Sequence, residues 1–329
     1  MKKIRFGVIG TGKIVDNFLK AALTHENFEL VAMYSRTLEK AKDFGKKYGA
    51  TKFFDNLESF SKCEDIDAVY IASPNSFHAS QAIMCIENNK HVLCEKPMAS
   101  NLREVKKMIS LAEEKGVLLM EAMRITVLPN FLRVKENLHK IGKIRRYFAS
   151  YCQYSSRYDK YKEGIILNAF KRELSNGALM DIGVYCIHPM IALLGKPNGI
   201  VSQAVFLENG IDGQGTAMAS YGDAGGLIMY SKISDSKLPL EIQGEDGTIL
   251  IDGILFKSAK IVYRDGREEV ISIRQREDDM YYELDEFIKV INSNEVDSMK
   301  NSHKNSLMAI ELMDKIRSQI GLEFPADFN

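Results

Sequence analysis

The sequence predicts two domains: an α/β domain with a doubly wound, mainly parallel sheet, followed by an α+β domain with a large, mainly antiparallel open sheet. Up to about Met123, short apolar runs alternate with helical patterns, as they do in parallel sheets. After Lys143, β-type runs follow one another without helices between them, which favours antiparallel pairing. A length of 329 residues suits two domains. We expect one domain at residues 1–123 and a second at residues 124–329, whose C-terminal helices are able to pack back on the first.

The composition is that of a globular protein without a charge bias. Hydrophobic residues make up 45% and charged residues 27% of the chain, and the formal net charge is zero. We therefore expect no nucleic-acid partner and no membrane partner. The 5 cysteines form no C-x-x-C pair, which argues against a disulfide framework and a structural zinc site. No signal peptide is apparent, and no apolar stretch approaches the ~20 residues of a membrane span. We expect a cytoplasmic protein.

The first element is a short apolar run at residues 4–9, which predicts a strand buried on both faces. It ends at Gly10, which allows a sharp turn, and Gly12 has no Cβ atom, so that a pyrophosphate can approach the backbone. The helix that follows directs its N–H groups and positive dipole end at that phosphate. The residues expected at this site are Gly10, Thr11, Gly12, Lys13 and Ile14. A plain strand–turn–helix is the alternative, because the glycine pattern alone is weak evidence. Val15 stands where a third Gly or Ala is usual, which argues against close packing of the helix on the strand but does not remove the phosphate site.

The end of the second predicted strand, at residues 28–34, bears on the choice between NAD and NADP. An acidic residue there binds the ribose 2′-hydroxyl of NAD, whereas a basic residue accommodates the 2′-phosphate of NADP. The strand is followed by Ser35 and Arg36, and no acid occurs before Glu39. We therefore favour NADP over NAD, with Arg36 on the phosphate and with Ser35 and Thr37 as candidate hydroxyl donors to the cofactor. The alternative is that Arg36 is solvated or stacks on the adenine.

Two loops of the first domain follow strands and are expected at the sheet edge where ligands bind. The predicted strands here are 51–54, 67–72, 92–94 and 117–120, and the predicted helices are 38–48, 76–88 and 101–115. Ser73-Pro74-Asn75 follows one strand, and Pro74 prevents that strand from continuing. Glu95-Lys96-Pro97 follows another, as a charged pair held by a proline. His78 lies in the first turn of a helix, where a structural histidine is a simpler interpretation than a ligand.

The second domain is expected to consist of one long sheet with few helices. A strand at residues 143–154 leads into an irregular segment that ends near residue 176, and residues 177–194 read as a helix stopped by Gly195 and Pro197. The strands expected next are 199–208, 214–221, 225–233, 238–244, 248–251, 254–264 and 268–274. Two amphipathic helices, at residues 278–291 and 305–320, close the chain and are given no chemical role.

The chain resembles the Gfo/Idh/MocA oxidoreductases, a family named for glucose–fructose oxidoreductase and inositol dehydrogenase. The residues that carry the resemblance are Gly10 and Gly12, Ser73-Pro74-Asn75 with His78, and above all Cys94-Glu95-Lys96-Pro97. Ser35-Arg36, the run 94–98 and Glu121-Ala122-Met123 are most similar to the dimeric dihydrodiol dehydrogenase branch, which uses NADP. An arginine usual in that branch is replaced near Thr126. The resemblance implies a Rossmann domain for the cofactor and a homodimer or homotetramer. The further cofactor contacts that it implies are Ser73, Pro74, Asn75, His78, Glu95, Lys96 and Pro97.

A candidate catalytic set combines Lys96 with a pair in the helix expected at residues 177–194. Asp181 and Tyr185 are four residues apart, so on a regular helix they share a face. The resemblance implies that these two act with Lys96 on a carbinol carbon. Lys96 would stabilise the developing oxyanion, and Tyr185 would exchange the proton, helped by the ammonium beside it. Asp181 would orient the lysine or the substrate hydroxyls. The alternative is an ordinary helix pair and a surface lysine.

Three function hypotheses follow from these residues. The first is an oxidoreductase that transfers hydride between NADP, or NAD, and a sugar, polyol or diol, without a metal. The second is a redox-neutral NAD-dependent glycosidase of the same fold, and the third is a nicotinamide-sensing regulator without catalysis. The joint presence of Lys96, Asp181 and Tyr185 argues against the regulator. Tyr154, Arg157 and His188 are candidate substrate contacts, but the substrate and the direction of the reaction are not readable from the sequence.

Overall fold

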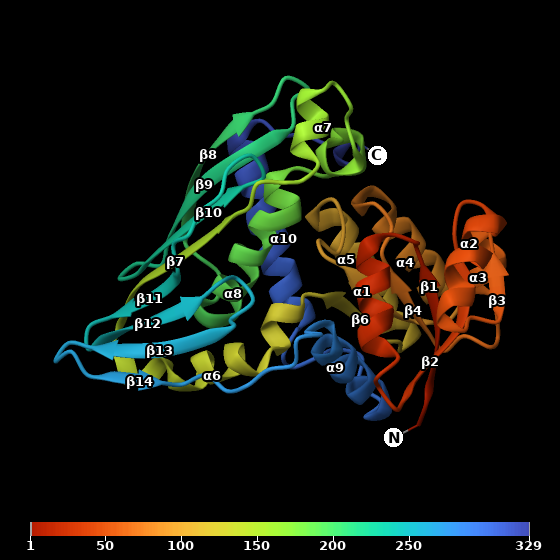
Figure 1. The fold of residues 1–329 in the computed structure, drawn as a ribbon, viewed down its shortest axis with the longest axis horizontal. Helices are drawn as coiled ribbons and strands as arrows, with labels where there is room; N and C mark the ends of the chain where they lie inside the picture. Colours follow the sequence, from red (N-terminus) through yellow and green to blue (C-terminus); the bar gives the residue numbers. More distant parts are fainter. Residues whose placement is uncertain (1, 329) are drawn as a thin grey trace. The chain divides into compact units, whose positions relative to one another are not determined.

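The computed structural model describes residues 2–328 and divides into two compact units. Unit 1 combines Met1–Arg124 with Arg276–Ser306, and unit 2 combines Ile125–Gln275 with Leu307–Asn329. The first unit therefore includes a segment that the chain reaches only after most of the second has been completed. Each unit has its own sheet (Figure 1).

Unit 1 contains a six-stranded parallel sheet in the order β3-β2-β1-β4-β5-β6. Its strands are β1 (Ile4–Ile9), β2 (Phe28–Tyr34), β3 (Lys52–Phe54), β4 (Ala68–Ile71), β5 (His91–Glu95) and β6 (Leu119–Ala122). The six strands alternating with helices are confirmed, although β6 begins two residues later than expected. The strand order reverses between β1 and β4, which places the turns after these two strands at the ligand-binding edge of a doubly wound sheet.

The helices of unit 1 cover this sheet. They are α1 (Lys13–Ala22), α2 (Leu38–Gly45), α3 (Leu57–Ser61), α4 (His78–Glu87), α5 (Leu102–Lys115) and α9 (Met280–Asn292). The core on the α1 and α9 side is aromatic. The centroid of the Phe6 ring lies 4.8 Å from that of Phe28 and 5.9 Å from that of Phe287 in α9. Phe18 stacks on Tyr70 with 3.7 Å between the ring centroids. The late segment containing α9 therefore belongs to the hydrophobic core of unit 1.

Unit 2 contains an eight-stranded sheet in the order β14-β13-β12-β11-β7-β10-β9-β8. Its strands are β7 (Ile144–Cys152), β8 (Gly199–Phe206), β9 (Asp212–Ser220), β10 (Gly225–Ser231), β11 (Leu240–Gly244), β12 (Gly247–Asp252), β13 (Ser258–Tyr263) and β14 (Glu268–Val270). All neighbours pair antiparallel except β7 and β10, which are parallel. The mainly antiparallel sheet is confirmed.

The two faces of this sheet differ in exposure. Alternate residues such as Ala217 and Ile228 are buried on the face that carries α8 (Figure 1). On the opposite face, the paired residues Val201 and Met218 are 65% and 59% exposed. The helices of unit 2 are α6 (Pro129–Asn137), α7 (Tyr158–Lys162), α8 (Val184–Leu194) and most of α10 (His303–Ile320).

Three sequence-based expectations for the second part of the chain require correction. Helix α6 was not predicted; Pro129 at its N-terminus, a favoured position for proline, is a signal that could have indicated it. The predicted helix at residues 177–194 is not one regular helix, because Leu179–Gly183 is a π-helical turn that precedes α8. The irregular segment before it contains the short helix α7 and two 3₁₀ turns.

The segment Arg172–Leu194 also corrects an expectation. Over 23 residues it is long and apolar enough to cross a membrane, whereas we expected no stretch of that kind. Of its most apolar window, 78% is buried inside the fold, as in the core helix of a globular protein. Its apolar character is therefore explained by packing within unit 2.

Candidate active site

The glycine loop of unit 1 connects β1 to α1 and leaves open space at the N-terminus of the helix. Gly10 has φ +117°, and a Cβ atom there would lie 2.7 Å from the Ala72 carbonyl oxygen. Gly12 is the N-cap of α1 in an extended conformation, and no side chain caps the helix. A Cβ atom on Gly12 would meet nothing within 4 Å. Among the described residues, no side chain caps the first N–H groups of α1 and the space beside Gly12 is open, which suits a phosphate.

Val15, at the third position of the glycine pattern, is compatible with close packing of α1. Its side chain is fully buried, and its Cγ2 atom lies 3.3 Å from the position of a Cβ atom on Gly10. The larger residue therefore fills the space between the helix and the strand.

Arg36 lies just beyond β2 and is exposed. Within residues 2–328, no hydrogen bond or ion pair occupies its guanidinium group. Ser35 is buried, and the Thr37 hydroxyl caps α2 by accepting from Lys40 N. Arg36 is the only charged residue of the three that follow β2, and its guanidinium group is available to bind an anion.

The two loops predicted at the ligand-binding edge are joined by His78. Its Nδ1 and Nε2 atoms lie 3.0 Å from the Pro97 carbonyl oxygen and 2.9 Å from the Ser73 carbonyl oxygen. Burial lowers the pKa of His78, against the effect of these two carbonyl groups. The Ser73 hydroxyl donates to Gln81 Oε1 at 2.7 Å. His78 therefore has the structural role favoured from the sequence, and its contact with a cofactor stays a prediction.

Lys96 is half-buried, and its surroundings in unit 1 are acidic. Its neighbour Glu95, the last residue of β5, is buried and accepts a hydrogen bond of 2.6 Å from the Tyr70 hydroxyl. Burial raises the pKa of Glu95, although the charge of Lys96 opposes this. The bond between Lys96 and Pro97 is cis. The Glu95 side chain therefore lies inside unit 1, next to Lys96. The contact of Glu95 with the cofactor remains a prediction.

Glu121 holds the chain that follows Pro97, a role not inferred from the sequence. One carboxyl oxygen accepts from Met98 N at 3.0 Å, and the other accepts from the Ser306 hydroxyl at 2.6 Å. Glu121 had been noted only as part of the resemblance. Its role depends on Ser306, which is distant in sequence, and so no local pattern could have revealed it.

In unit 2, Asp181 lies in the π-helical turn and forms an ion pair with Lys232. The Lys232 Nζ atom is 2.7 Å from Asp181 Oδ2 and 2.8 Å from the Ala169 carbonyl oxygen. The Lys232 side chain is 3% exposed, and that of Asp181 is 31% exposed. Lys232 was not identified from the sequence, because it follows a strand of ordinary pattern.

Tyr185 lies in the first turn of α8, and its ring packs edge-on against Tyr151 at 5.7 Å. The π-helical turn ends two residues before it. The α-helical spacing used to place Asp181 and Tyr185 on one face therefore does not hold across this segment. π-helical turns occur often at functional sites, but their position is not encoded in hydrophobic periodicity.

The candidate substrate contacts have different environments within unit 2. His188 is buried in α8. The Tyr154 hydroxyl donates to Asp159 Oδ1 at 2.7 Å, and its ring lies 5.5 Å from that of Tyr158. Arg157 is exposed next to α7. A substrate role for these residues stays a prediction.

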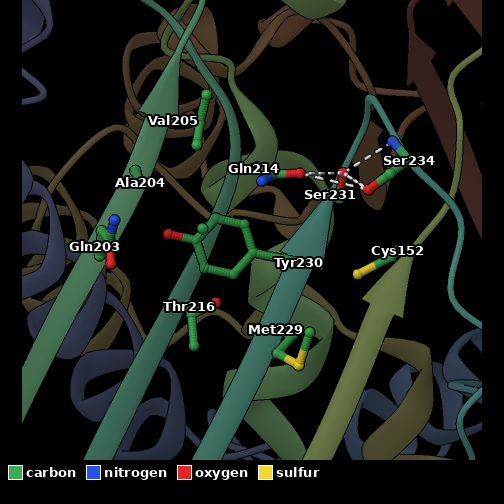
Figure 2. Close-up of a pocket in the computed structure, with 11 residues that line it drawn as sticks. Cys152, Gln203, Ala204, Val205, Gln214, Thr216, Met229, Tyr230, Ser231 and Ser234 are labelled. Carbon is green, nitrogen blue, oxygen red and sulfur yellow. Dashed lines mark hydrogen bonds between the residues drawn. The ribbon is translucent and has the colours of Figure 1, made fainter.

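A hollow of about 240 Å³ in unit 2 lies over strands β7 to β10 and contains none of the predicted site residues. Figure 2 shows Gln214, Ser231 and Ser234 linked at one end of it by hydrogen bonds of 2.7 to 3.4 Å. Among residues 2–328, His, Cys, Asp and Glu side chains form no group of three that could hold a metal ion.

Comparison with known proteins agrees with these two units. Residues 4–123 match the oxidoreductase family with an NAD-binding Rossmann fold, and residues 131–250 match the Gfo/Idh/MocA C-terminal domain. A Bacillus subtilis protein named scyllo-inositol 2-dehydrogenase (NADP(+)) is 50% identical over 98% of this chain and 99% of its own. A Xenopus tropicalis trans-1,2-dihydrobenzene-1,2-diol dehydrogenase is 27% identical with the same coverage.

The solved structures show the same fold. A 3-ketoreductase from Actinomadura kijaniata, in complex with NADP and TDP-benzene, has a TM-score of 0.86 at 24% identity and covers 97% of this chain and 98% of its own. Together with the full-length identity to the Bacillus relative, this confirms the resemblance seen in the Glu95-Lys96-Pro97 loop. The chain is an enzyme that belongs to the Gfo/Idh/MocA family of NAD(P)-dependent oxidoreductases.

Proposed function

We propose that the chain is an NADP-dependent dehydrogenase that acts on a carbinol carbon of a cyclic polyol of the inositol class. The observation that carries this proposal is the 50% identity, over 98% of this chain, to the relative named scyllo-inositol 2-dehydrogenase (NADP(+)). Relatives named as dehydrogenases of a dihydrobenzenediol support a substrate with CH–OH carbons. Localisation in the cytoplasm and assembly into a homodimer or homotetramer remain predictions.

The residues of unit 1 fit the proposed cofactor. The uncapped N-terminus of α1 and the space in front of Gly12 suit a pyrophosphate, and the exposed Arg36 suits a 2′-phosphate. Thr11, Lys13 and Ile14 would complete the pyrophosphate site. The bound nicotinamide would supply the acceptor for the hydride that leaves the substrate carbon.

The chain's own residues would manage the substrate oxygen and its proton. We assign to Lys96 the stabilisation of negative charge on the carbinol oxygen, and to Tyr185 the acceptance of its proton. Asp181 would bind neighbouring substrate hydroxyls, since its Oδ2 atom is already engaged by Lys232. In the reverse direction, Tyr185 would return the proton to the oxygen of the reduced carbonyl group.

The proposal is tested by supplying the purified full chain with NADP⁺ and a panel of inositols, open-chain polyols and diols. We expect NADPH to form with at least one inositol. Replacing Lys96 with Met should lower kcat by about 10²–10³-fold, as is typical for the loss of an oxyanion donor. The matched control is Lys62→Met, which removes an exposed lysine paired with Glu58 in the same unit. NADPH binding without turnover of any polyol would contradict the proposal.

Selection of the cofactor by Arg36 is tested separately by thermal shift. The chain has no tryptophan, so quenching of indole fluorescence cannot report binding. A ligand at 100 times its Kd adds about 2.7 kcal/mol to the free energy of unfolding. We expect a larger shift with NADPH than with NADH, and Arg36→Ala should remove the difference. An unchanged preference for NADPH in Arg36→Ala would show that Arg36 does not bind the 2′-phosphate.

A further inference from the structure

Lys232 occupies an unusual position for a lysine, because its ammonium group lies inside unit 2. The side chain is 3% exposed, and its Nζ atom lies 4.8 Å from the centre of the Phe170 ring. A buried ammonium is costly unless it is paired and hydrogen-bonded. Its hydrogen bonds to Asp181 Oδ2 and to the Ala169 carbonyl oxygen supply that compensation.

The backbone around Lys232 fixes the origin of this side chain. Lys232 follows β10 directly, and its N–H group donates to the Gly213 carbonyl oxygen in β9 at 2.9 Å. The residue before Gly213 in β9 is Asp212. Its Oδ2 atom accepts a hydrogen bond of 2.7 Å from the N–H group of Leu179, the first residue of the π-helical turn. Two neighbouring strands thus hold the turn, one at its beginning and one at Asp181.

Within unit 2, Asp181 and its bonded cation Lys232 lie near a second carboxyl group. Asp212 is the second carboxyl group near Lys232; burial raises the pKa of Asp212 to about 7, although the charge of Lys232 opposes this. The Lys232 ammonium group therefore has both Asp181 and Asp212 near it. Of the two carboxyl groups, Asp181 bonds directly to the ammonium and is partly exposed to solvent.

We propose that Lys232 is a positioning residue that holds Asp181 in one orientation for a hydroxyl group of the polyol substrate. A carboxylate with one oxygen fixed by a buried cation loses little freedom when it binds a hydroxyl group. The same ammonium group donates a hydrogen bond to the Ala169 carbonyl oxygen, so it also fixes the backbone at Ala169. This inference rests on the proposed function, because it assigns Asp181 to the substrate.

The test compares Lys232→Met, Lys232→Arg, Asp181→Asn and the double variant with the full-length wild type. We expect Lys232→Met to lower kcat/KM for the polyol by about 10- to 100-fold, the effect of losing a hydrogen bond to a charged group. The KM for NADP⁺ should not change. The acid limb of the kcat/KM profile should move to higher pH, because Asp181 has lost the cation that favours its ionised form. Compared with Lys232→Met, Lys232→Arg should have a higher kcat/KM, and the acid limb of its profile should lie at the pH of the wild type.

The double variant separates positioning from a general structural effect. If Lys232 acts through Asp181, adding Lys232→Met to Asp181→Asn should lower kcat/KM little further, since coupled residues are not additive. Lys196→Met, which removes a half-exposed lysine paired with Glu311 in the same unit, is the control and should resemble the wild type. If Lys232→Met does not fold, Lys232→Arg is compared with the wild type. The double variant, which removes both charges, is compared with Asp181→Asn.

The outcomes distinguish this inference from the proposed function. A wild type that oxidises an inositol, with Lys232→Met equal to it in kcat/KM and pH profile, would overturn the inference alone. Additive losses in the double variant, or a lower melting temperature with an unchanged pH profile, would also overturn it. A wild type that turns over no polyol would overturn both.

Discussion

At the scale of single residues, unit 1 buries the carboxyl groups of Glu95 and Glu283. Glu283 in α9 is fully buried, and neither of its carboxyl oxygens has a hydrogen-bond partner among the described residues. Burial, and secondly the charge of Glu95, raise the pKa of Glu283 well above its ordinary value, while Arg124 opposes the shift. Glu283 therefore keeps a proton in the folded protein at pH values where the unfolded chain has lost it.

This shift predicts how Glu283→Gln changes stability with pH. Above the ordinary pKa of 4.5, the folded state binds more protons than the unfolded state, so the free energy of unfolding falls as pH rises toward the folded pKa. Gln removes this penalty and keeps the size of the side chain. We expect Glu283→Gln to raise the melting temperature by about 2 °C or more at about pH 8, and by less at about pH 5.

The matched control for Glu283→Gln is Glu114→Gln, which changes an exposed glutamate in α5 of the same unit. It should leave the melting temperature unchanged at both pH values. A gain for Glu283→Gln that is equal at both pH values, or larger at the lower one, would show that Glu283 is ionised in the folded protein.

At the scale of elements, the turn between β1 and α1 contains two glycines with different physical roles. Gly10 has φ +117° and no room for a Cβ atom, so it is needed for folding of the turn. Gly12 has φ −84° and ψ 176°, which any residue adopts, and open space where a Cβ atom would lie. Gly12 is therefore not needed by the fold itself, and the space before it is available to a ligand.

We predict that alanine substitutions separate these two roles. Gly12→Ala should keep the melting temperature of the protein without ligand but lose most of the increase caused by NADPH, because the methyl group fills the space of the pyrophosphate. Gly10→Ala should lower the melting temperature of the protein without ligand, through strain of about 1–3 kcal/mol and contact with Ala72. Thermal shift with and without NADPH measures both. A full NADPH shift in Gly12→Ala would place the pyrophosphate elsewhere.

The elements that the sequence predicts well are those whose signals are local. The glycine loop, the strands of unit 1 and the loop at Lys96 can be recognised from short apolar runs and from the residues that stop them. The π-helical turn at Asp181 has no such signal, because its backbone is held by Asp212 and Lys232, which belong to strands reached later. A regular helix was therefore the natural prediction, and the partner of Asp181 could not be named.

At the scale of the whole molecule, the path of the chain makes unit 1 dependent on a late segment. The amphipathic pattern of α9 was read from the sequence, but not the sheet that it covers. The structure places Met280, Leu284, Phe287 and Ile288 in the same core as Phe6 and Phe28. The predicted domain at residues 1–123 lacks these side chains, so whether that stretch folds by itself is a testable question.

We predict that a fragment of residues 1–124 does not fold alone, because removing α9 exposes the aromatic core beside Phe6 to water. A second fragment joins residues 1–124 to 276–306 through a short Gly/Ser linker, which should restore a cooperative thermal transition and an NADPH-dependent shift. Such a linker is feasible because Arg124 Nη1 lies 2.8 Å from Asp279 Oδ1. The end of the first segment of unit 1 and the beginning of its second segment are therefore close together.

The control for the joined fragment is the same fragment with Phe287→Asp, which places a carboxylate in the core and should abolish the transition. Circular dichroism melting, with and without NADPH, compares the three fragments. Cooperative unfolding and NADPH binding by residues 1–124 alone would show that α9 only covers a domain already stable. Failure of the joined fragment while the full chain folds would show that unit 1 also needs residues of unit 2. The expected result, folding only when α9 is present, would make the cofactor domain a unit that the chain completes only after the strands of unit 2.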